Sequence, residues 1–259
     1  MKKIDAHIHY VNFNQESQGF DSLLRAMDQC DVEKAVIFGL PVKKKWAYHE
    51  TIKPGYYLDG YSTCYYYTLT DEFLAHHFAS LAPDDQSRFA LLLCGFDPTD
   101  KSTPGYLDYM LDKYPFWKGL GELLLRHDEL SLHTTGELPR ANHPALIGLY
   151  EYCDKHNFPV LFHHNAQSVG YEHKAVYVDE VREAIDQFPS VQFVWAHAGA
   201  SSRTVWRADY LDILSDLLQQ HPNLAIDISW KVYEQEILID GKNPKPEFVT
   251  LINSSLIDL

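Results

Sequence analysis

Short apolar runs alternate with segments of helical spacing along most of the chain. After a first run that contains the stretch DAHIH (residues 5–9), apolar runs lie at 34–41, 88–98, 117–125, 158–165, 191–199 and 223–229. Segments with apolar residues at helical spacing lie between them, at 20–30, 103–115, 143–156, 177–189 and 208–222. Apolar strands that alternate with helices predict a parallel sheet covered by helices. The seven predicted strands are one short of the eight in a TIM-type (β/α)8 barrel.

One long segment interrupts this alternation. Residues 42–82 follow the second predicted strand and are too long for an ordinary loop of such a fold. Because the active sites of these barrels lie at the C-terminal ends of the strands, we interpret 42–82 as a lid insertion. Its aromatic side chains either line a pocket or pack within the lid: Trp46, Tyr56, Tyr57, Tyr61, Tyr65, Tyr66 and Tyr67. The chain shows no repeat or linker, so residues 1–259 are predicted to form a single domain.

Composition narrows the class of protein. The 259 residues are close to the ~250 of a single barrel. A net charge of −14 argues against a nucleic-acid-binding protein, which needs a basic surface, and no stretch is apolar enough to span a membrane. Four scattered cysteines form no disulfide framework, which indicates a reducing compartment. We therefore expect a cytoplasmic protein that acts on a small molecule, without nucleic-acid or membrane partners, and leave open whether it forms a homo-oligomer.

Polar residues interrupt the apolar strands near their C-terminal ends. Alternate residues of a strand share a face, so His7 and His9 point the same way in the first strand. Later strands carry further groups of this kind: Glu122, the neighbours His163 and His164, His197 and Asp227. Strand ends of a barrel converge on one mouth, and imidazoles with a carboxylate are the ligands that zinc and similar divalent ions prefer.

This series of motifs resembles the amidohydrolase superfamily, specifically the amidohydrolase family 2 branch of metal-dependent hydrolases and decarboxylases. The resemblance covers essentially the whole chain and rests on DAHIH, GLGE, PVLFHHN, WAHAG and AIDIS in the first, fourth, fifth, sixth and seventh strands. It implies that His7, His9 and a histidine of the fifth strand bind a divalent metal, with zinc as the expected ion. It also implies that His197 lies nearby as a catalytic base or an additional ligand.

Two assignments depend on the details of single strands. Neighbouring strand residues point to opposite faces, so only one of His163 and His164 can face the interior. The family pattern places the ligand directly after the apolar run, which favours His163, although a bulge would reverse the choice. Where some relatives carry a carboxylated lysine between two metals, this chain has Glu122. We interpret Glu122 as a catalytic-site carboxylate that either binds metal or holds a histidine or a substrate hydroxyl, and we predict one metal rather than two.

The strand-eight aspartate of the family has no counterpart here. After Asp227 the chain continues to Leu259, and its last fifteen residues are predicted to form the helix that precedes that strand. Asp227 itself is expected to support neighbouring groups, as in relatives. We expect a continuation of the chain, another segment or another subunit to fill the eighth position, and weak activity without it.

Three residues are expected to contact substrate. Arg126 follows the fourth strand and Arg203 the sixth, where each either clamps a substrate carboxylate or remains solvated, and Trp46 contributes from the lid. The predicted function is hydrolysis of a small carboxylated amide, ester or lactone by a metal-activated water. A non-oxidative decarboxylase with the same ligands, a TatD-like nuclease and an inactive metal-binding remnant are the alternatives. The acidic composition disfavours the nuclease.

Overall fold

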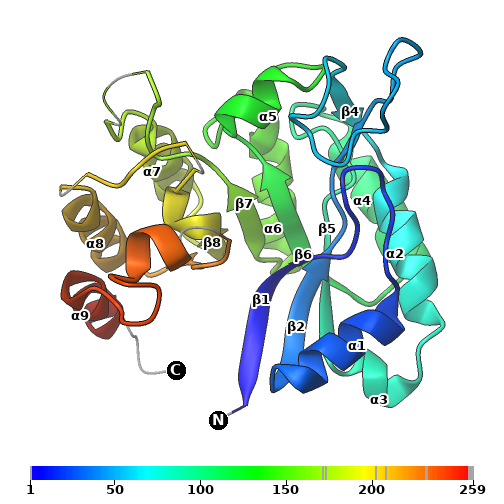
Figure 1. Ribbon diagram of the computed structural model, residues 1–259, viewed down its shortest axis with the longest axis horizontal. Helices are drawn as coiled ribbons and strands as arrows, with labels where there is room; N and C mark the ends of the chain where they lie inside the picture. Colours follow the sequence, from blue (N-terminus) through cyan, green and yellow to red (C-terminus); the bar gives the residue numbers. More distant parts are fainter. Residues whose placement is uncertain are drawn as a thin grey trace.

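The computed structural model describes residues 2–255, apart from 171, 173, 202, 208, 231 and 232. Seven parallel strands form one sheet in the order β1-β2-β5-β6-β7-β8-β9. The sheet curls into a half-barrel with helices around it (Figure 1). The strands are β1 (Lys3–His9), β2 (Val32–Phe38), β5 (Phe89–Leu93), β6 (Trp117–Leu124), β7 (Val160–His163), β8 (Phe193–Trp195) and β9 (Leu224–Ile226). All seven coincide with predicted apolar runs, and the TIM-type architecture is confirmed.

The helices also follow the predicted spacing. Five amphipathic segments form α1 (Phe20–Gln29), α4 (Thr103–Lys113), α6 (Ile147–His156), α7 (Val178–Gln187) and α8 (Tyr210–Gln220). The other helical elements are α2 (Leu69–Ala79), α3 (Pro83–Gln86), α5 (Asp128–Leu132), α9 (Pro246–Ser255), η1 (Pro144–Leu146), η2 (Ala196–Gly199) and η3 (Tyr233–Ile237). In Figure 1, α1, α2 and α4 lie on one side of the half-barrel, and α7, α8 and α9 lie on the other.

Two apolar layers hold the sheet in place. Leu91 and Leu93 of β5 belong to the large core cluster, which also includes buried helix residues such as Leu107 and Leu214. Leu92, the residue between them, belongs to a smaller cluster with side chains of other strands. Neighbouring strand residues therefore point to opposite faces, and both faces are apolar, as expected for a parallel sheet inside a layer of helices.

The segment predicted to be a lid insertion contains two different parts. Residues 42–82 divide into an antiparallel pair, β3 (Val42–Lys44) and β4 (Cys64–Tyr66), and the helix α2. Helix α2 is an ordinary covering helix, because its buried Asp71 accepts hydrogen bonds from the backbone N–H groups of Cys94 and Gly95 at the end of β5. We therefore restrict the name insertion to residues 42–67. Sequence spacing did not separate the two parts because both are rich in aromatic residues.

Strands β1 and β9 form the two edges of the sheet. No strand among the described residues pairs with the outer side of either, and Ile4 of β1 is 69% exposed. The absence of strand eight from the described part of the chain matches the prediction. The helix predicted for the last fifteen residues is also present as α9, while 256–259 lie outside the described residues.

Two predictions from composition can be compared with the structure. The cysteines Cys30, Cys64, Cys94 and Cys153 are all free. Within the described ranges, the search for a helix with the length and hydropathy of a membrane span finds none.

Candidate metal centre and active site

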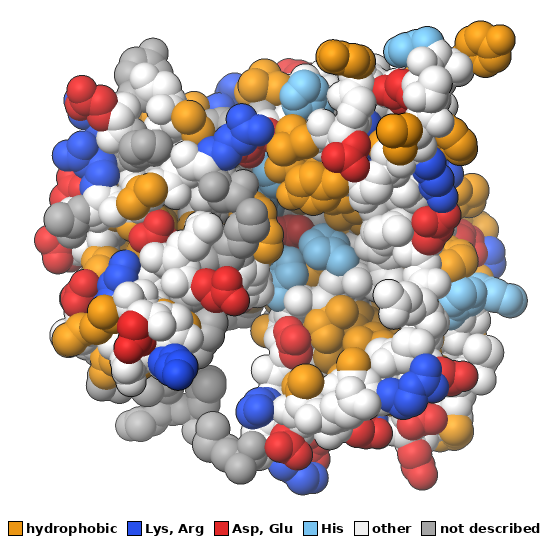
Figure 2. All heavy atoms as spheres, viewed as in Figure 1, with side chains coloured by type: hydrophobic (Ala, Val, Ile, Leu, Met, Phe, Trp, Pro, Cys, Tyr) orange, Lys and Arg blue, Asp and Glu red, His pale blue; other side chains and the backbone are white. Residues whose placement is uncertain are grey.

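A cavity of about 340 Å³ opens at the C-terminal ends of the strands. His7, His9, Glu122, His163 and His197 border it, so the strand-end histidines of the predicted site meet in one place. Figure 2 shows histidine side chains at the bottom of a hollow in the middle of the viewed face, with hydrophobic side chains beside them. The convergence follows from the topology, because parallel strands bring their carboxyl ends to the same edge of a sheet.

Glu122 of β6 lies at the centre of the four imidazoles. Its Oε2 atom is 3.1 Å from His9 Nε2 and 3.8 Å from His7 Nε2. Its Oε1 atom is 3.3 Å from His163 Nδ1 and 3.4 Å from His197 Nε2. Oε2 of Glu122 therefore faces the two histidines of β1. Oε1 faces His163, the last residue of β7, and His197, which follows β8.

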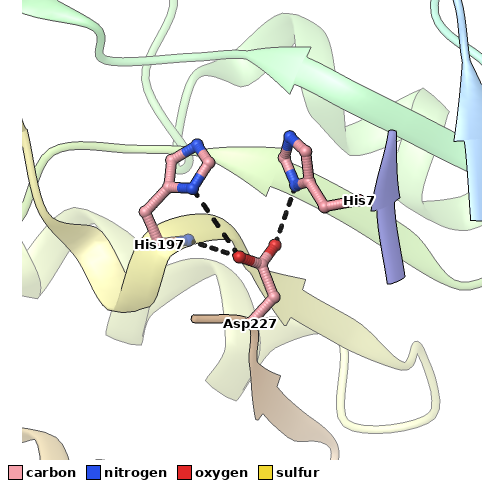
Figure 3. Close-up of side chains that lie close together, drawn as sticks. All are labelled: His7, His197 and Asp227. Carbon is pink, nitrogen blue, oxygen red and sulfur yellow. Dashed lines mark hydrogen bonds and ion pairs between the residues drawn. The ribbon is translucent and has the colours of Figure 1, made fainter. Parts of the chain in front are cut away.

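Asp227, just after β9, holds two of these rings from behind (Figure 3). His7 Nδ1 lies 2.9 Å from Asp227 Oδ2, and the backbone N–H of His197 donates to Asp227 Oδ1 at 2.9 Å. Ser229 Oγ donates to the same Oδ1 atom, so its oxygen accepts from His197 Nδ1 at 2.8 Å. Asp227 thus fixes the Nδ1–H tautomer of both rings, which agrees with the supporting role predicted for it.

The other two rings are anchored in the same manner. His9 Nδ1 donates to the carbonyl oxygen of Gly39 at 3.0 Å. His163 Nε2 lies 3.0 Å from Asn165 Oδ1, which leaves Nδ1 as the free acceptor. In each of the four rings, one nitrogen has an outer hydrogen-bond partner and the other nitrogen faces Glu122. Outer hydrogen bonds of this kind orient histidines that ligate metals.

Local backbone geometry places Glu122 and His197 in the cluster. Gly121 has φ of +141°, and a Cβ atom there would lie 2.6 Å from the Cβ and O atoms of Leu161. The close approach of β6 to β7 therefore requires glycine directly before Glu122. His197 itself has φ of +55°, and the hydrogen bond from its N–H to Asp227 holds that conformation.

The charges of the centre follow from its burial. Burial alone would raise the pKa of Glu122, but the surrounding histidines outweigh it and hold this pKa well below its usual range. Burial lowers the pKa of His163 to about 4. Burial opposes protonation of His197 too, but the Glu122 and Asp227 carboxylates raise its pKa overall. A divalent cation requires deprotonated ligands, and the lowered pKa values of Glu122 and His163 favour that state for these two groups.

The donor set fits a divalent metal. Glu122 Oε1 is buried and has no hydrogen-bond partner, although a buried carboxylate oxygen normally has one. Two compact groups of donor atoms meet at this residue: Glu122 with His7 and His9, and Glu122 with His163 and His197. A third group joins His7, His197 and Asp227. Imidazoles with a carboxylate match the preference of zinc, so these residues could hold one ion, or two with Glu122 between them.

His163 rather than His164 faces this centre. His164 is turned away, with its Nε2 atom 3.0 Å from Glu180 Oε2 on α7. The parity of β7 therefore continues through His163 without the bulge that would have reversed the choice. Asp5 lies outside the cluster, where its carboxylate accepts a hydrogen bond from the backbone N–H of His7.

The three residues predicted to contact substrate do not border the cavity. Arg126 forms a two-pronged ion pair with Glu180 and lies over the ring of Tyr177. Arg203 is 3.1 Å from Glu129. Trp46 is 54% exposed and donates to the carbonyl oxygen of Glu50. Strand spacing placed these residues near the mouth, but it could not show which carboxylates would pair with the two arginines.

Other residues border the cavity instead. His127 stacks on His163 with ring centres 4.2 Å apart, and Trp230 lies 5.2 Å from the His197 ring. Of the insertion tyrosines proposed as lining, Tyr56 and Tyr57 border the cavity, and the other four do not. His127 comes two residues after the fourth predicted strand, next to Arg126. No sequence pattern singled out Trp230, whose φ of +64° turns the chain after β9.

Comparisons with known proteins give a consistent assignment. The family model for amidohydrolases matches residues 4–258. A search of curated proteins finds no match. An amidohydrolase from Burkholderia multivorans with bound zinc is similar in structure, with a TM-score of 0.54 and 10% identity over 98% of this chain and 79% of that one. For 4-oxalomesaconate hydratase from Rhodopseudomonas palustris the TM-score is 0.51, with 13% identity over 97% and 78%. At these identities the two structures support the fold.

Proposed function

Because the chain belongs to the amidohydrolase family, we propose that it is a divalent-metal-dependent hydrolase of a small amide, ester or lactone. The observation that carries this proposal is the convergence of four imidazole lone pairs on Glu122, whose buried Oε1 atom has no hydrogen-bond partner. Zinc is the ion that we propose, since these donors suit it. The roles given to individual residues below are part of the same proposal.

His7, His9 and His163 would hold the ion together with Glu122. When bound, a divalent metal polarises a carbonyl oxygen and lowers the pKa of a water towards ~7. His197 presents its Nε2 atom at the same point, where it can accept a proton and return it to the leaving group. Asp227 stabilises the charged ring that results, because it accepts from the His197 backbone and lies 3.6 Å from Nδ1.

The structure places no arginine where it would bind the carboxylate that was expected on the substrate, in the part of the chain that it describes. That expectation depended on Arg126 and Arg203, which are paired with Glu180 and Glu129 and do not border the cavity. We therefore propose a reacting carbonyl group at the histidine end and make no use of either arginine in binding it.

A non-oxidative decarboxylase is the second candidate. The apolar walls of the cavity favour it, because they suit the ring of an aromatic acid whose carboxylate would lie at the histidine end. The nuclease alternative is disfavoured by the net charge of −14, which repels a polyanion.

Product analysis of the zinc-loaded protein separates these candidates. Phenyl acetate, acetanilide, dihydrocoumarin and 2,6-dihydroxybenzoate are incubated with the protein, and released acid and carbon dioxide are measured. Release of acid from one of the first three supports the hydrolase, and carbon dioxide from the benzoate supports the decarboxylase. Zinc-loaded protein that turns over none of them contradicts both and supports the metal-binding remnant.

His197→Asn separates chemistry from metal binding in the same assay. We expect this variant to keep most of the zinc and to lose turnover by about a hundredfold or more, as for the loss of a general base. An equal loss of zinc and turnover would make His197 a ligand instead.

A further inference from the structure

The cavity has one polar end, and its remaining walls are mainly apolar. The polar end consists of Glu122 and the four histidines around it. The other walls come from the segment after β1, from the insertion, and from the strand ends and the loops that follow them. Apart from His127, Asn12 and Ser229, these walls consist of Val11, Phe13, Leu40, Tyr56, Tyr57, Leu124, Leu130 and Trp230.

Three of these side chains form an aromatic corner in the cavity wall. Phe13 and Tyr56 meet edge to face with ring centres 5.4 Å apart, and Tyr57 lies 4.3 Å from Tyr56 and 5.1 Å from Phe13. Tyr57 also meets the His127 ring edge to face at 5.5 Å. Such corners bind flat rings, because aromatic pairs prefer offset or edge-to-face contacts.

No lysine or arginine borders the cavity in the part of the chain that the structure describes. Three cations in that part of the chain are paired with other groups. Arg126 is paired with Glu180, and Arg203 with Glu129. The buried Lys44 donates to the carbonyl oxygens of Tyr57 and Ser62, which fastens the aromatic corner from its outer side.

This arrangement discriminates between substrates by charge. A carboxylate placed against the apolar walls would lose its hydration without gaining a cation or several N–H donors. The net charge of −14 adds long-range repulsion against a dianion. An uncharged ring at the same place instead removes apolar surface from water on both sides, which favours binding.

We propose that the substrate has a single polar reacting group at the histidine end and an uncharged, flat aromatic body against Phe13, Tyr56 and Tyr57. This inference rests on the proposed function only for the position of the reacting group. It holds for an aryl ester, an anilide or an aromatic lactone, and equally for a simple aromatic acid whose one carboxylate lies at the histidine end.

Matched hydroxamates test the inference on zinc-loaded protein by titration calorimetry. Benzohydroxamate carries the ring, acetohydroxamate lacks it, and 4-carboxybenzohydroxamate adds a second anionic group. We expect benzohydroxamate to bind about tenfold or more tightly than acetohydroxamate, as for burial of a phenyl group. We expect the added carboxylate to weaken binding by about tenfold. Equal affinity of the first two, or tighter binding of the carboxylated probe, would overturn the inference.

Two tyrosines of equal exposure provide a matched pair of variants. Tyr56 borders the cavity and is 39% exposed, whereas Tyr65 of β4 is 38% exposed and does not border it. We expect Tyr56→Ala to remove most of the advantage of the ring and Tyr65→Ala to leave the advantage unchanged. If both variants behave alike, the aromatic corner is not the binding surface.

A metal-free measurement keeps this inference separate from the proposed function. Ligand-observed NMR on the metal-free protein ranks benzamide, acetamide and 4-carboxybenzamide. Protein that takes up no zinc but ranks benzamide first contradicts the proposed function and supports the aromatic body. Protein that takes up zinc but prefers the carboxylated probes supports the metal site and overturns the aromatic body.

Discussion

The strand ends and the insertion at 42–67 border the same cavity, but they are held in different ways. The strand-end histidines are placed by parallel pairing, and each ring is then locked by an outer partner such as Asp227 or Gly39. The insertion has the short pair β3 and β4 and a bridge between Cys64 and Thr134, and single side chains hold much of its long loop. Glu50, for example, accepts from the N–H groups of Ala47, Tyr61 and Ser62. The strand ends thus supply the cluster of histidines and Glu122, and the insertion adds Tyr56 and Tyr57 to the cavity wall.

If strand packing places Glu122, a methyl group at Gly121 should damage the whole centre. The Cβ atom of Gly121→Ala would meet the backbone oxygen of Leu161 at 2.6 Å, in a backbone conformation that side chains rarely adopt. We expect a loss of about 3 kcal/mol in the free energy of unfolding, measured in urea. Gly148→Ala is the control, since nothing lies within 4 Å of its Cβ position on the exposed side of α6. A similar effect of both changes would contradict this packing.

Loss of the Asp227 charge should weaken metal binding while the fold remains. Asn at this position keeps the size of the side chain but cannot accept from His7, His197 and Ser229 with two carboxylate oxygens. We expect Asp227→Asn to lower zinc affinity by about 10- to 100-fold in a competition assay with a chelating dye. Asp216→Asn, exposed on α8, should leave the affinity unchanged. Unchanged zinc affinity in Asp227→Asn would show that the outer hydrogen bonds do not orient the rings.

The ion-pair cluster of Glu180 with His164 and Arg126 should make the stability of the fold depend on pH. Burial would raise the pKa of Glu180, but His164 and Arg126 outweigh it and lower this pKa to about 2. A carboxyl group with a lowered pKa stabilises the fold above its unfolded-state value of ~4.3 and loses this contribution as the pH falls towards 2. We therefore expect Glu180→Gln to cost about 2 kcal/mol at pH 7 and less at pH 3.5. Asp179→Asn on the same helix is the control. A cost that is independent of pH would contradict the ion-pair explanation.

In the insertion, we expect a smaller change in stability and a change in substrate binding. Lys44→Met leaves the carbonyl oxygens of Tyr57 and Ser62 without their donor, which should cost about 1–2 kcal/mol. The displaced Tyr57 should raise KM with kcat and zinc content nearly unchanged. Lys43→Met, the neighbour on β3, is the control. A loss of zinc in Lys44→Met would show that the insertion also shapes the metal centre.

The difference between strand ends and loops also explains which features could be predicted from the sequence. Apolar periodicity located all seven strands, and strand parity with the family motifs selected His7, His9, His163, His197 and Glu122, which do meet in the structure. The strands were located and these side chains meet because regular pairing converts sequence position into spatial position.

Predictions for loops were less successful for the opposite reason. Arg126, Arg203 and Trp46 were expected at the substrate, but each has a partner that spacing could not reveal. Loop side chains are placed by individual long-range contacts, so neither Trp230 nor the aromatic corner followed from periodicity. The insertion was predicted to extend to residue 82 because nothing in its composition marked the start of α2.

Elemental analysis shows whether the strand ends form a metal centre. The wild type and His7→Ala/His9→Ala are purified, loaded with zinc and dialysed, and bound zinc per chain is then measured. His49→Ala/His133→Ala, with two exposed histidines replaced, is the matched control. We predict about one zinc ion per chain in the wild type and the control, and none in His7→Ala/His9→Ala. The same zinc content in all three folded proteins would contradict the account.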